Sequence, residues 1–428
     1  MIKYNLLPNI KFNIKKLPAA IICLVFFVGT EAAAQSKLQG TNSTNRERIS
    51  INKGWRFYRY NDAEKPDTLI YDVRPDARGN IDERAADAKP TEAVKVEASS
   101  GVLKPYILPT GNAFIKDRAK RYIRPTGNPG DNFPFVKSDF DDSKWESVEL
   151  PHDWAIKGPF YKGQRTPVGG SMGRLPVQGV AWYRRKLEIP AADAGKSIFL
   201  DVDGAMSYAM VWLNGKLVGG WPYGYNSWRV DLTPYIVPGG KNQLAIRLDN
   251  PVNSSRWYPG GGIYRNVWLV KTNPVHVSQW GTFCQTSAVS NKSAKVNLRT
   301  IIDNDSKTGG SFSIKTDFYL LNAAGNKVGQ SVVKTGLKNV MIRSNSSDTV
   351  NEDVIIANPK LWQPLPDINH NLYAAVTTLF AKGKPMDTYE THFGIRDVRF
   401  DPEKGILVNG KQVFATAAES RGIFSADN

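Results

Sequence analysis

The sequence predicts an all-β protein made of two consecutive sandwich domains, and three observations support this prediction. Apolar and polar residues alternate over short stretches such as 198–202, 244–248 and 312–320. Asn-Gly pairs follow apolar runs at 214–215 and 409–410, a pattern typical of type I′ hairpins. The 36 Gly and 26 Pro are scattered along the chain, which suits many short strands joined by turns rather than long helices.

The strand patterns fall into two groups. Those from 135 to 270 predict the first sandwich, which we assign to residues 51–272 with structure beginning at Ile51. Within it, residues 62–131 are charged and rich in Ala, Pro and Gly, so we expect a long, partly irregular insertion. A second group over 273–397 predicts an immunoglobulin-like sandwich. A last hairpin over 406–413 begins a further region, 398–428.

The N-terminus predicts an export signal over residues 1–34. Lysines precede a short apolar run, 17–28, and small residues at 32–34 suit a signal peptidase. The run is shorter than the roughly 20 residues that a membrane span needs. A lipid anchor at Cys23 is disfavoured because Ile22 precedes it. We therefore expect a secreted or periplasmic protein with no membrane attachment after cleavage, and a flexible lead-in over 35–50.

Cysteine content and charge narrow the functional classes. Cys23 and Cys284 are the two cysteines, so cleavage of the signal would leave Cys284 without an intrachain partner. We expect Cys284 to be a small buried hydrophobe rather than a nucleophile. The net charge is +16, but the Lys and Arg are dispersed and no nucleic-acid-binding motif is present. We interpret the charge as a basic surface suited to an acidic-glycan setting, and we expect no nucleic-acid partner.

Several motifs in a fixed order carry a resemblance to a known family. They are Leu150-Pro151-His152-Asp153-Trp154, Trp182-Tyr183-Arg184-Arg185, Asp203-Gly204-Ala205, Val211-Trp212-Leu213-Asn214-Gly215, Arg256 to Arg265, Asn358 to Trp362, Phe393-Gly394-Ile395-Arg396 and Leu407 to Lys411. Their order resembles the N-terminal part of family 2 glycoside hydrolases, from Trp55 to Val413. The segments Trp221 to Tyr225 and Ser255 to Pro259 look like the β-galactosidase branch.

The resemblance implies a jelly-roll sugar-binding domain, an immunoglobulin-like domain and a catalytic TIM barrel. It implies hydrolysis of β-glycosidic bonds by two Glu residues on barrel strands, at a carboxyl separation of about 5–5.5 Å if the enzyme is retaining. A barrel takes roughly 250 residues, whereas few residues follow Arg396. We therefore expect residues 398–428 to hold only the first hairpin of the barrel, in a truncated chain with no catalytic residue.

The sequence departs from the family pattern at two places. Some relatives place an Asp six residues before the Gly of the Gly-Ile-Tyr-Arg motif, where Arg256 stands here. After Phe414 the familiar continuation is missing, which suggests a frame break or truncation.

The chain's own carboxylates and histidines predict structural roles. Asp139, Asp141, Asp142 and Asp153 are typical of turns and solvated loops. His152 and Asp153 invite a general-base interpretation, but fixing a loop between strands suits a Leu-Pro-His-Asp-Trp turn better. The four His are far apart in sequence, so we expect no metal site and no cofactor. The glycines 260–262 predict close backbone packing.

The aromatic residues supply the candidate sugar contacts, since a ring offers an apolar face with a polar tip. The substrate-binding candidates are Trp221, Tyr223, Arg256, Trp257 and Tyr258. The alternative is that most of the aromatic residues, including Tyr225 and Trp228, pack the sandwich or a domain interface.

Three functional hypotheses follow. The first is the front part of an exported β-galactosidase-like enzyme, inactive alone, whose partner is a β-galactoside-type glycan. The second is a stand-alone carbohydrate-binding module. The third is a fragment that complements a separate barrel chain; an exposed barrel-facing surface would also favour self-association.

Overall fold

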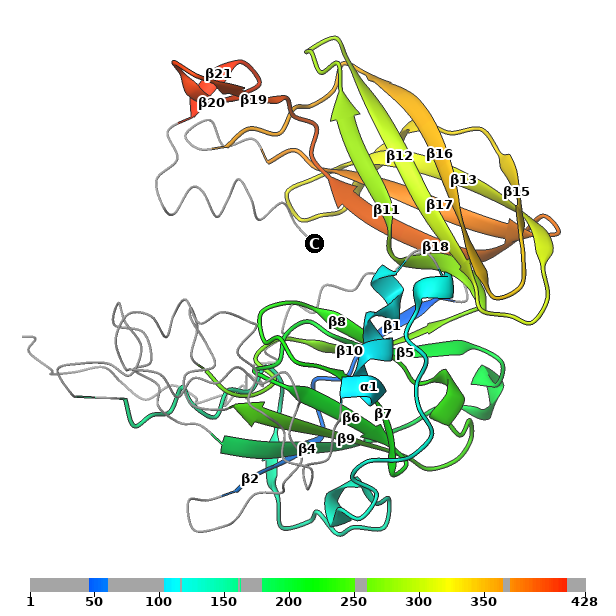
Figure 1. The fold of residues 1–428 in the computed structure, drawn as a ribbon. Helices are drawn as coiled ribbons and strands as arrows, with labels where there is room; N and C mark the ends of the chain where they lie inside the picture. Colours follow the sequence, from blue (N-terminus) through cyan, green and yellow to red (C-terminus); the bar gives the residue numbers. More distant parts are fainter. Residues whose placement is uncertain are drawn as a thin grey trace, which may run out of the picture. The chain divides into compact units, whose positions relative to one another are not determined.

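The structure is a computed structural model that describes residues 46–60, 104–115, 118–160, 162, 179–250, 260–364 and 370–413. The predicted signal peptide, 1–34, lies outside these residues. Antiparallel strands dominate the described part and confirm the predicted all-β sandwich fold (Figure 1). No helix within the described ranges is long and apolar enough to cross a membrane.

Strands β1 to β10 form the first sandwich. One sheet has the order β1-β10-β5-β8 and the other the order β3-β2-β4-β9-β6-β7. The strands are β1 (Glu47–Ser50), β2 (Trp55–Arg59), β3 (Glu146–Val148), β4 (Gly179–Leu187), β5 (Ser197–Val202), β6 (Ala209–Leu213), β7 (Lys216–Trp221), β8 (Trp228–Asp231), β9 (Asn242–Asn250) and β10 (Val267–Thr272). The short helices η5 (Ala191–Asp193) and η6 (Thr233–Tyr235) lie in its connections.

The first strand corrects the predicted lead-in of residues 35–50. β1 pairs with β10 over Glu47 to Ser50, so the fold starts earlier than Ile51. Polar side chains hold this edge strand, since the Glu47 carboxylate lies 3.1 Å from Lys196 Nζ and 3.5 Å from Lys271 Nζ. An edge strand fixed by ion pairs lacks the apolar alternation on which the prediction depends.

The main core lies between the two sheets of this sandwich. The alternating side chains of Ile198, Leu200 and Val202 point into it, as their period of two predicts. The β6–β7 turn is the predicted Asn-Gly turn, with φ of 52° at Asn214 and 76° at Gly215. Two positive φ angles are what a type I′ turn requires.

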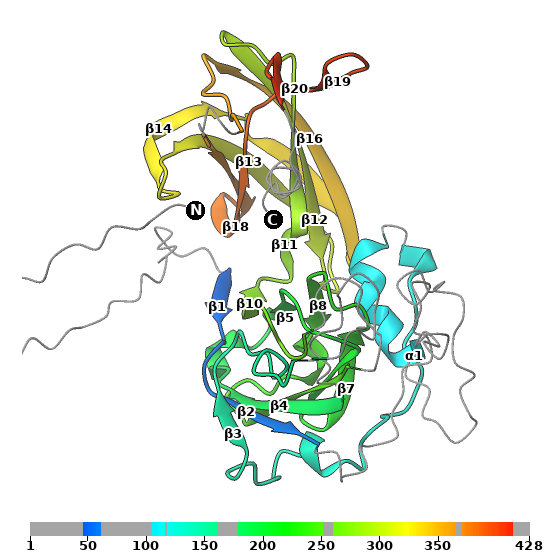
Figure 2. The ribbon, with the colours of Figure 1, turned by 90° about the vertical axis from the view of Figure 1, so that its left-hand side faces the viewer.

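The outer face of the six-stranded sheet is also buried. The fully buried Trp182 and Trp212 rings lie on this face with centroids 5.3 Å apart. Residues of the segment before β3 cover them, including Ile107 and Val136. This segment holds α1 (Lys104–Ile107), η2 (Leu108–Phe114), η3 (Arg118–Lys120) and η4 (Pro134–Val136). Figure 2 shows α1 beside β7.

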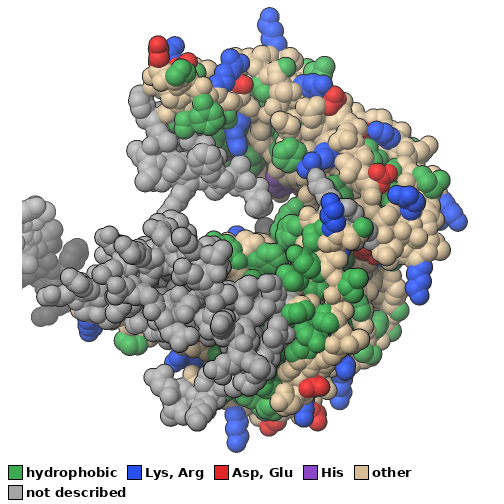
Figure 3. Space-filling view, viewed as in Figure 1, with side chains coloured by type: hydrophobic (Ala, Val, Ile, Leu, Met, Phe, Trp, Pro, Cys, Tyr) green, Lys and Arg blue, Asp and Glu red, His purple; other side chains and the backbone are tan. Residues whose placement is uncertain are grey.

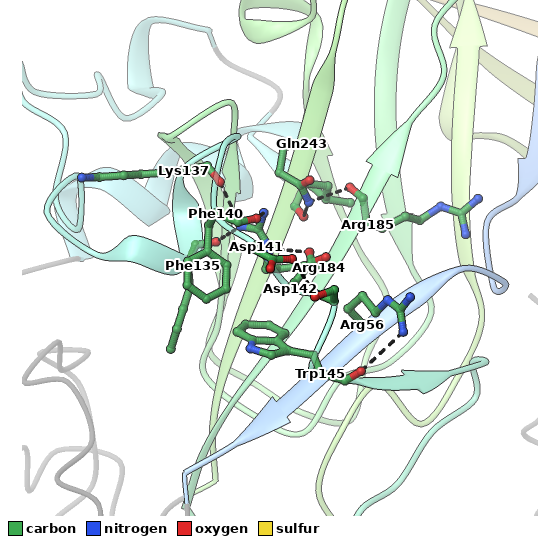
Figure 4. Close-up of polar contacts among 12 residues, drawn as sticks. Arg56, Phe135, Lys137, Phe140, Asp141, Asp142, Trp145, Arg184, Arg185 and Gln243 are labelled. Atoms are coloured by element: carbon green, nitrogen blue, oxygen red, sulfur yellow. Dashed lines mark hydrogen bonds and ion pairs between the residues drawn. The ribbon is translucent and has the colours of Figure 1, made fainter.

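Arg184 in β4 joins this cover to the sheet (Figure 4). Its side chain is fully buried, and its Nε donates to Asp142 Oδ2 at 2.8 Å. The guanidinium also donates to the carbonyl oxygens of Phe135, Lys137 and Phe140. The buried charge is therefore neutralised, and several of its donors are used.

Strands β11 to β18 form the second sandwich. One sheet has the order β11-β12-β16 and the other the order β14-β13-β17-β18, with β15 also paired to β13. The strands are β11 (Val275–Ser287), β12 (Ser293–Asn304), β13 (Gly310–Leu321), β14 (Lys327–Lys334), β15 (Lys338–Ile342), β16 (Ser346–Ala357), β17 (Tyr373–Ala381) and β18 (Lys384–Phe393). Cys284 packs partly buried against its core, and burial raises the pKa of its thiol to about 12.

The predicted last hairpin is present as a small sheet of β19 (Val398–Asp401), β20 (Gly405–Val408) and β21 (Lys411–Val413). Its turn has φ of 51° at Asn409 and 79° at Gly410. Asn409 Nδ2 donates to the Trp362 carbonyl oxygen at 2.8 Å, which ties the turn to the segment before β17. Residues 414–428 lie outside the described part.

Burial of His276 in β11 makes stability depend on pH. Its Nδ1 lies 3.0 Å from the Asn273 carbonyl oxygen, which can only accept, so Nδ1 carries the donated proton. The ring packs against Phe199 with centroids 5.7 Å apart. Loss of solvent, aided by the positive charge of Arg46 and opposed by Asp303, lowers the pKa of His276 from 6.5 to about 4.

Acidification is therefore expected to destabilise the protein through this residue. Above pH 6.5 the ring is neutral in both states, and between 6.5 and about 4 the unfolded chain binds the proton first. The loss reaches about 3 kcal/mol near pH 4. Urea unfolding of the wild type and of His276→Asn across this range checks it, since the variant keeps a donor but cannot titrate. Equal losses in both proteins would contradict the assignment.

Candidate functional site

Four connections of the first sandwich gather at one end of its strands. Gly179 pairs with Asn250, Ala209 with Trp221, and Val202 with Trp228, so these antiparallel strands start or stop at the same edge. The described parts of the connections are residues 150–158, 203–208, 222–227 and 260–266. We call them the loop cluster. Loops at the end of a rigid sandwich are where binding residues commonly lie.

The Leu-Pro-His-Asp-Trp turn is fixed by backbone bonds. His152 N donates to Ile263 O at 2.8 Å, and Trp154 N donates to Gly261 O at 2.9 Å. Asp153 Oδ1 accepts from the backbone N–H of Ala155 at 2.7 Å and of Gly261 at 3.0 Å. The predicted loop-fixing role of this turn is confirmed.

The glycines of this region allow the close approach that the sequence predicts. A Cβ on Gly261 would lie 2.6 Å from the Trp154 ring. A Cβ on Gly262, whose φ is +125°, would lie 2.3 Å from the His152 carbonyl oxygen. Backbone and rings therefore occupy the space that a side chain would need.

His152 acts here as a structural residue. Its Nδ1 lies 2.8 Å from the hydroxyl of Tyr183, which is fully buried in β4. Burial lowers the pKa of His152 and raises that of Tyr183 well above its ordinary value. The neutral imidazole can thus accept a hydrogen bond from the Tyr183 hydroxyl, and the pair stays uncharged near neutral pH.

Tyr183→Phe is expected to destabilise the first sandwich by about 1 kcal/mol, because His152 loses its hydroxyl partner while the ring packing remains. The midpoint of urea unfolding, followed by Trp fluorescence, measures the effect. Tyr319→Phe on β13 is the matched control. An equal change in both variants would show that the Tyr183 hydroxyl bond contributes nothing.

The segment 222–227 is held against its neighbours. Tyr264 Oη donates to the Gly224 carbonyl oxygen at 2.6 Å. Met206 exchanges backbone hydrogen bonds with Gly262 at 2.9 and 3.1 Å, and its Sδ lies 2.3 Å from where a Gly224 Cβ would stand. The loop cluster is therefore a pre-arranged surface.

The candidate sugar contacts divide into three groups. Tyr223 is 54% exposed, and its ring meets Tyr225 edge-on at 5.3 Å. Trp221 is half-buried at the end of β7, and its Nε1 donates to Asn226 Oδ1 at 2.8 Å. Arg256, Trp257 and Tyr258 lie outside the described residues. Trp228 is buried in the core, as the packing alternative predicts.

The sequence did not predict Phe114, an aromatic neighbour of Trp221, or Trp280, an aromatic neighbour of Phe114. Phe114 lies 5.9 Å from the Trp221 ring and stacks on Trp280 with centroids 6.1 Å apart. Phe114 belongs to η2 and Trp280 to β11, so more than 100 residues separate Phe114 from Trp221 and from Trp280. For Phe114, the presence of aromatic residues in the charged insertion was the available signal in the sequence.

The Asp residues considered above as catalytic candidates have structural roles in the described part. Asp141 Oδ1 accepts the backbone N–H of Ser143 at 3.0 Å, which is an Asx turn, and Asp142 pairs with Arg184. Across the described ranges no three His, Cys, Asp or Glu are grouped to hold a metal ion. The loop cluster therefore offers aromatic faces and fixed backbone rather than an acid–base pair.

Two family models match the chain. The glycosyl hydrolase 2 galactose-binding domain-like model matches residues 174–258, which include the loop 222–227. The glycosyl hydrolases family 2 model matches residues 275–396, which cover the second sandwich.

Curated relatives and a solved structure agree with these matches. A β-galactosidase of Bacteroides ovatus is 39% identical over 66% of this chain and 32% of its own length. A β-glucuronidase of Formosa agariphila is 28% identical over 68% of this chain and 31% of its own. The crystal structure of a family 2 member from Bacteroides cellulosilyticus is 26% identical, with a TM-score of 0.58, and the match covers 85% of this chain and 38% of that one.

The chain thus spans about a third of the length of the relatives it matches. The galactose-binding domain-like model covers part of the first sandwich, and the family 2 model covers the second sandwich. The chain belongs to glycoside hydrolase family 2, and its match covers the N-terminal domains of that family.

Proposed function

We propose that this chain supplies the non-catalytic, glycan-positioning part of an exported enzyme that hydrolyses β-galactosides. The observation that carries the proposal is the loop cluster, whose exposed Tyr223 lies in the region matched by the galactose-binding domain-like model. The name of the Bacteroides ovatus relative supports the β-galactoside class. The signal-like residues 1–34 support export, and the sheet order is compatible with a jelly roll.

The catalytic carboxylates of such an enzyme are proposed to lie outside the described residues. Retaining hydrolysis needs two carboxyl groups about 5–5.5 Å apart, one of them with a raised pKa. At the loop cluster, Asp153 Oδ1 accepts from two backbone N–H groups, which fixes this carboxylate in the turn, and its Oδ2 is buried without a hydrogen-bond partner among the described residues. The chain's contribution to turnover would then be sugar binding and orientation.

Two measurements on the purified 428-residue chain test this function. No release of nitrophenol from nitrophenyl β-galactoside is expected, whereas calorimetry with β-galacto-oligosaccharides should show binding. Tyr223→Ala should weaken binding about tenfold by removing one stacking face. Phe400→Ala, a change of another exposed aromatic residue on β19, is the control. Turnover by the chain itself, or no heat with any galactoside, would overturn the proposal.

A second role, docking of a separate catalytic domain, is favoured by the last hairpin. Phe400 is 76% exposed and Val398 39% exposed, so β19 presents apolar side chains to solvent. Co-expression with the barrel part of a family 2 relative should restore hydrolysis. Phe400→Ala should reduce that restored activity without changing galactoside binding, and an unchanged activity would count against docking through β19.

A further inference from the structure

The segment 104–124 carries a strong local charge that the family models leave aside. It contains six Lys or Arg against the single Asp117: Lys104, Lys116, Arg118, Lys120, Arg121 and Arg124. The two family matches begin at residues 174 and 275, so this part of the insertion belongs to neither. The charge is dispersed elsewhere on the chain, so this cluster of basic residues is a candidate anion-binding surface.

Hydrogen bonds give the described part of this segment a defined shape. The Asn112 side chain accepts from Tyr122 N and donates to Tyr122 O, both at 2.9 Å. Arg121 Nε donates to the Ile115 carbonyl oxygen at 3.1 Å. Tyr106 Oη donates to Thr126 O at 2.9 Å. Lys120, Arg121 and Arg124 therefore belong to a folded unit rather than to a loose charged tail.

Large apolar side chains are exposed among these cations. Phe114 is 53% exposed, Tyr122 48% and Ile123 91%. Figure 3 shows hydrophobic side chains gathered over the α1–η2 segment. A contiguous apolar patch on a soluble protein commonly marks a binding surface.

Trp280 extends this patch at some conformational cost. Its backbone has φ of +49°, at the bulge of β11 between Val277 and Thr282. A bulky residue rarely adopts this conformation, and such strain concentrates at functional sites. Its N–H donates to Tyr389 Oη at 3.0 Å, and its ring is 46% exposed while stacked on Phe114 at an interplanar angle of 22°.

We propose that Phe114, Lys120, Tyr122 and Trp280, the basic–aromatic surface, bind an anionic polysaccharide. The rings would stack on the apolar faces of sugars, and the cations would pair with carboxylate or sulfate groups. The net positive charge of the segment 104–124 favours an anionic chain over a neutral glycan. The inference rests on the proposed function only in taking the ligand to be a glycan, and it adds that this glycan is acidic.

Nucleic acid is the rival occupant, because single strands also use rings and cations. Membership of a glycosidase family favours the polysaccharide. Affinity electrophoresis and calorimetry of the whole chain with polygalacturonate, a sulfated galactan, neutral galactan and an oligothymidylate separate these occupants. We expect binding to the two acidic polysaccharides, weaker at about 200 mM than at about 20 mM salt because of screening.

A charge-matched pair of variants separates this surface from the overall positive charge. Lys120 and Lys384 are both exposed, and Lys384 stands at the start of β18. Lys120→Glu should weaken polygalacturonate binding about fivefold, and Lys384→Glu should change it by less than about twofold. Equal effects of the two substitutions would overturn the proposal.

Removal of a ring tests the stacking part. Phe114→Ala should weaken polygalacturonate binding about fivefold to tenfold, and Phe400→Ala should leave it unchanged. Preference for neutral galactan or for oligothymidylate would overturn the inference. Galactoside binding at Tyr223 is read separately, so loss of one activity with retention of the other tells the two proposals apart.

Discussion

Asp142→Ala is expected to destabilise the first sandwich by about 3–5 kcal/mol, because it leaves a buried guanidinium without its anion. Arg184 is fully buried, and Asp142 Oδ2 is the carboxylate oxygen that its Nε contacts (Figure 4). The carbonyl oxygens of Phe135, Lys137 and Phe140 remain, but they carry no formal charge. Urea unfolding followed by Trp fluorescence measures the loss.

An exposed ion pair of the same kind is the control. Lys295 and Asp353 lie 2.7 Å apart on β12 and β16, with side chains 44% and 54% exposed. Asp353→Ala should destabilise the protein far less than Asp142→Ala, since solvent screens the pair. If Asp142→Ala were as mild as Asp353→Ala, the carbonyl oxygens alone would suffice to hold Arg184.

Trp212→Ala is expected to cost about 3–5 kcal/mol, the cost of a large cavity. The ring is fully buried on the outer face of the six-stranded sheet, against Trp182. Its Nε1 donates to the Pro129 carbonyl oxygen at 3.0 Å, so the variant also loses that bond. The same unfolding measurement gives the loss of stability. Limited proteolysis of the helical segment that covers the sheet shows whether losing the hydrogen bond to Pro129 loosens it.

Two further Trp variants sharpen this prediction. Trp212→Phe keeps much of the ring volume and should cost about 1–2 kcal/mol through the lost hydrogen bond and the smaller ring. Trp280→Ala, at a ring 46% exposed, should cost less than about 1 kcal/mol. A Trp212→Ala effect no larger than that of Trp280→Ala would mean that the insertion collapses to refill the cavity.

Much of the fold was predictable where side chains alternate. Apolar residues occupy every second position of 198–202, and these side chains of strand β5 point into the core as expected. The Asn-Gly turns at 214–215 and 409–410 were predictable because few other residue pairs accept two positive φ angles. Local chemistry alone decides these features.

Other features depend on contacts between distant residues. β1 was missed because ion pairs of Glu47, rather than an apolar face, hold it to the sheet. Trp221 and Tyr223 were named as candidates, but Phe114 and Trp280 come from segments far away in the chain. No pattern within a short window could show that their rings meet.

The doubly covered six-stranded sheet has a consequence for how this domain could be shortened or transplanted. All five residues of β6, Ala209–Leu213, are buried, and both faces of β4 carry buried side chains next to Arg184. Excising residues 104–136 to obtain a minimal sandwich would bare two indole rings and remove the Phe135 carbonyl oxygen that accepts from Arg184. A minimal version would need polar side chains in place of the apolar ones on the outward side of β4 and β6. The insertion is therefore a structural layer of the domain.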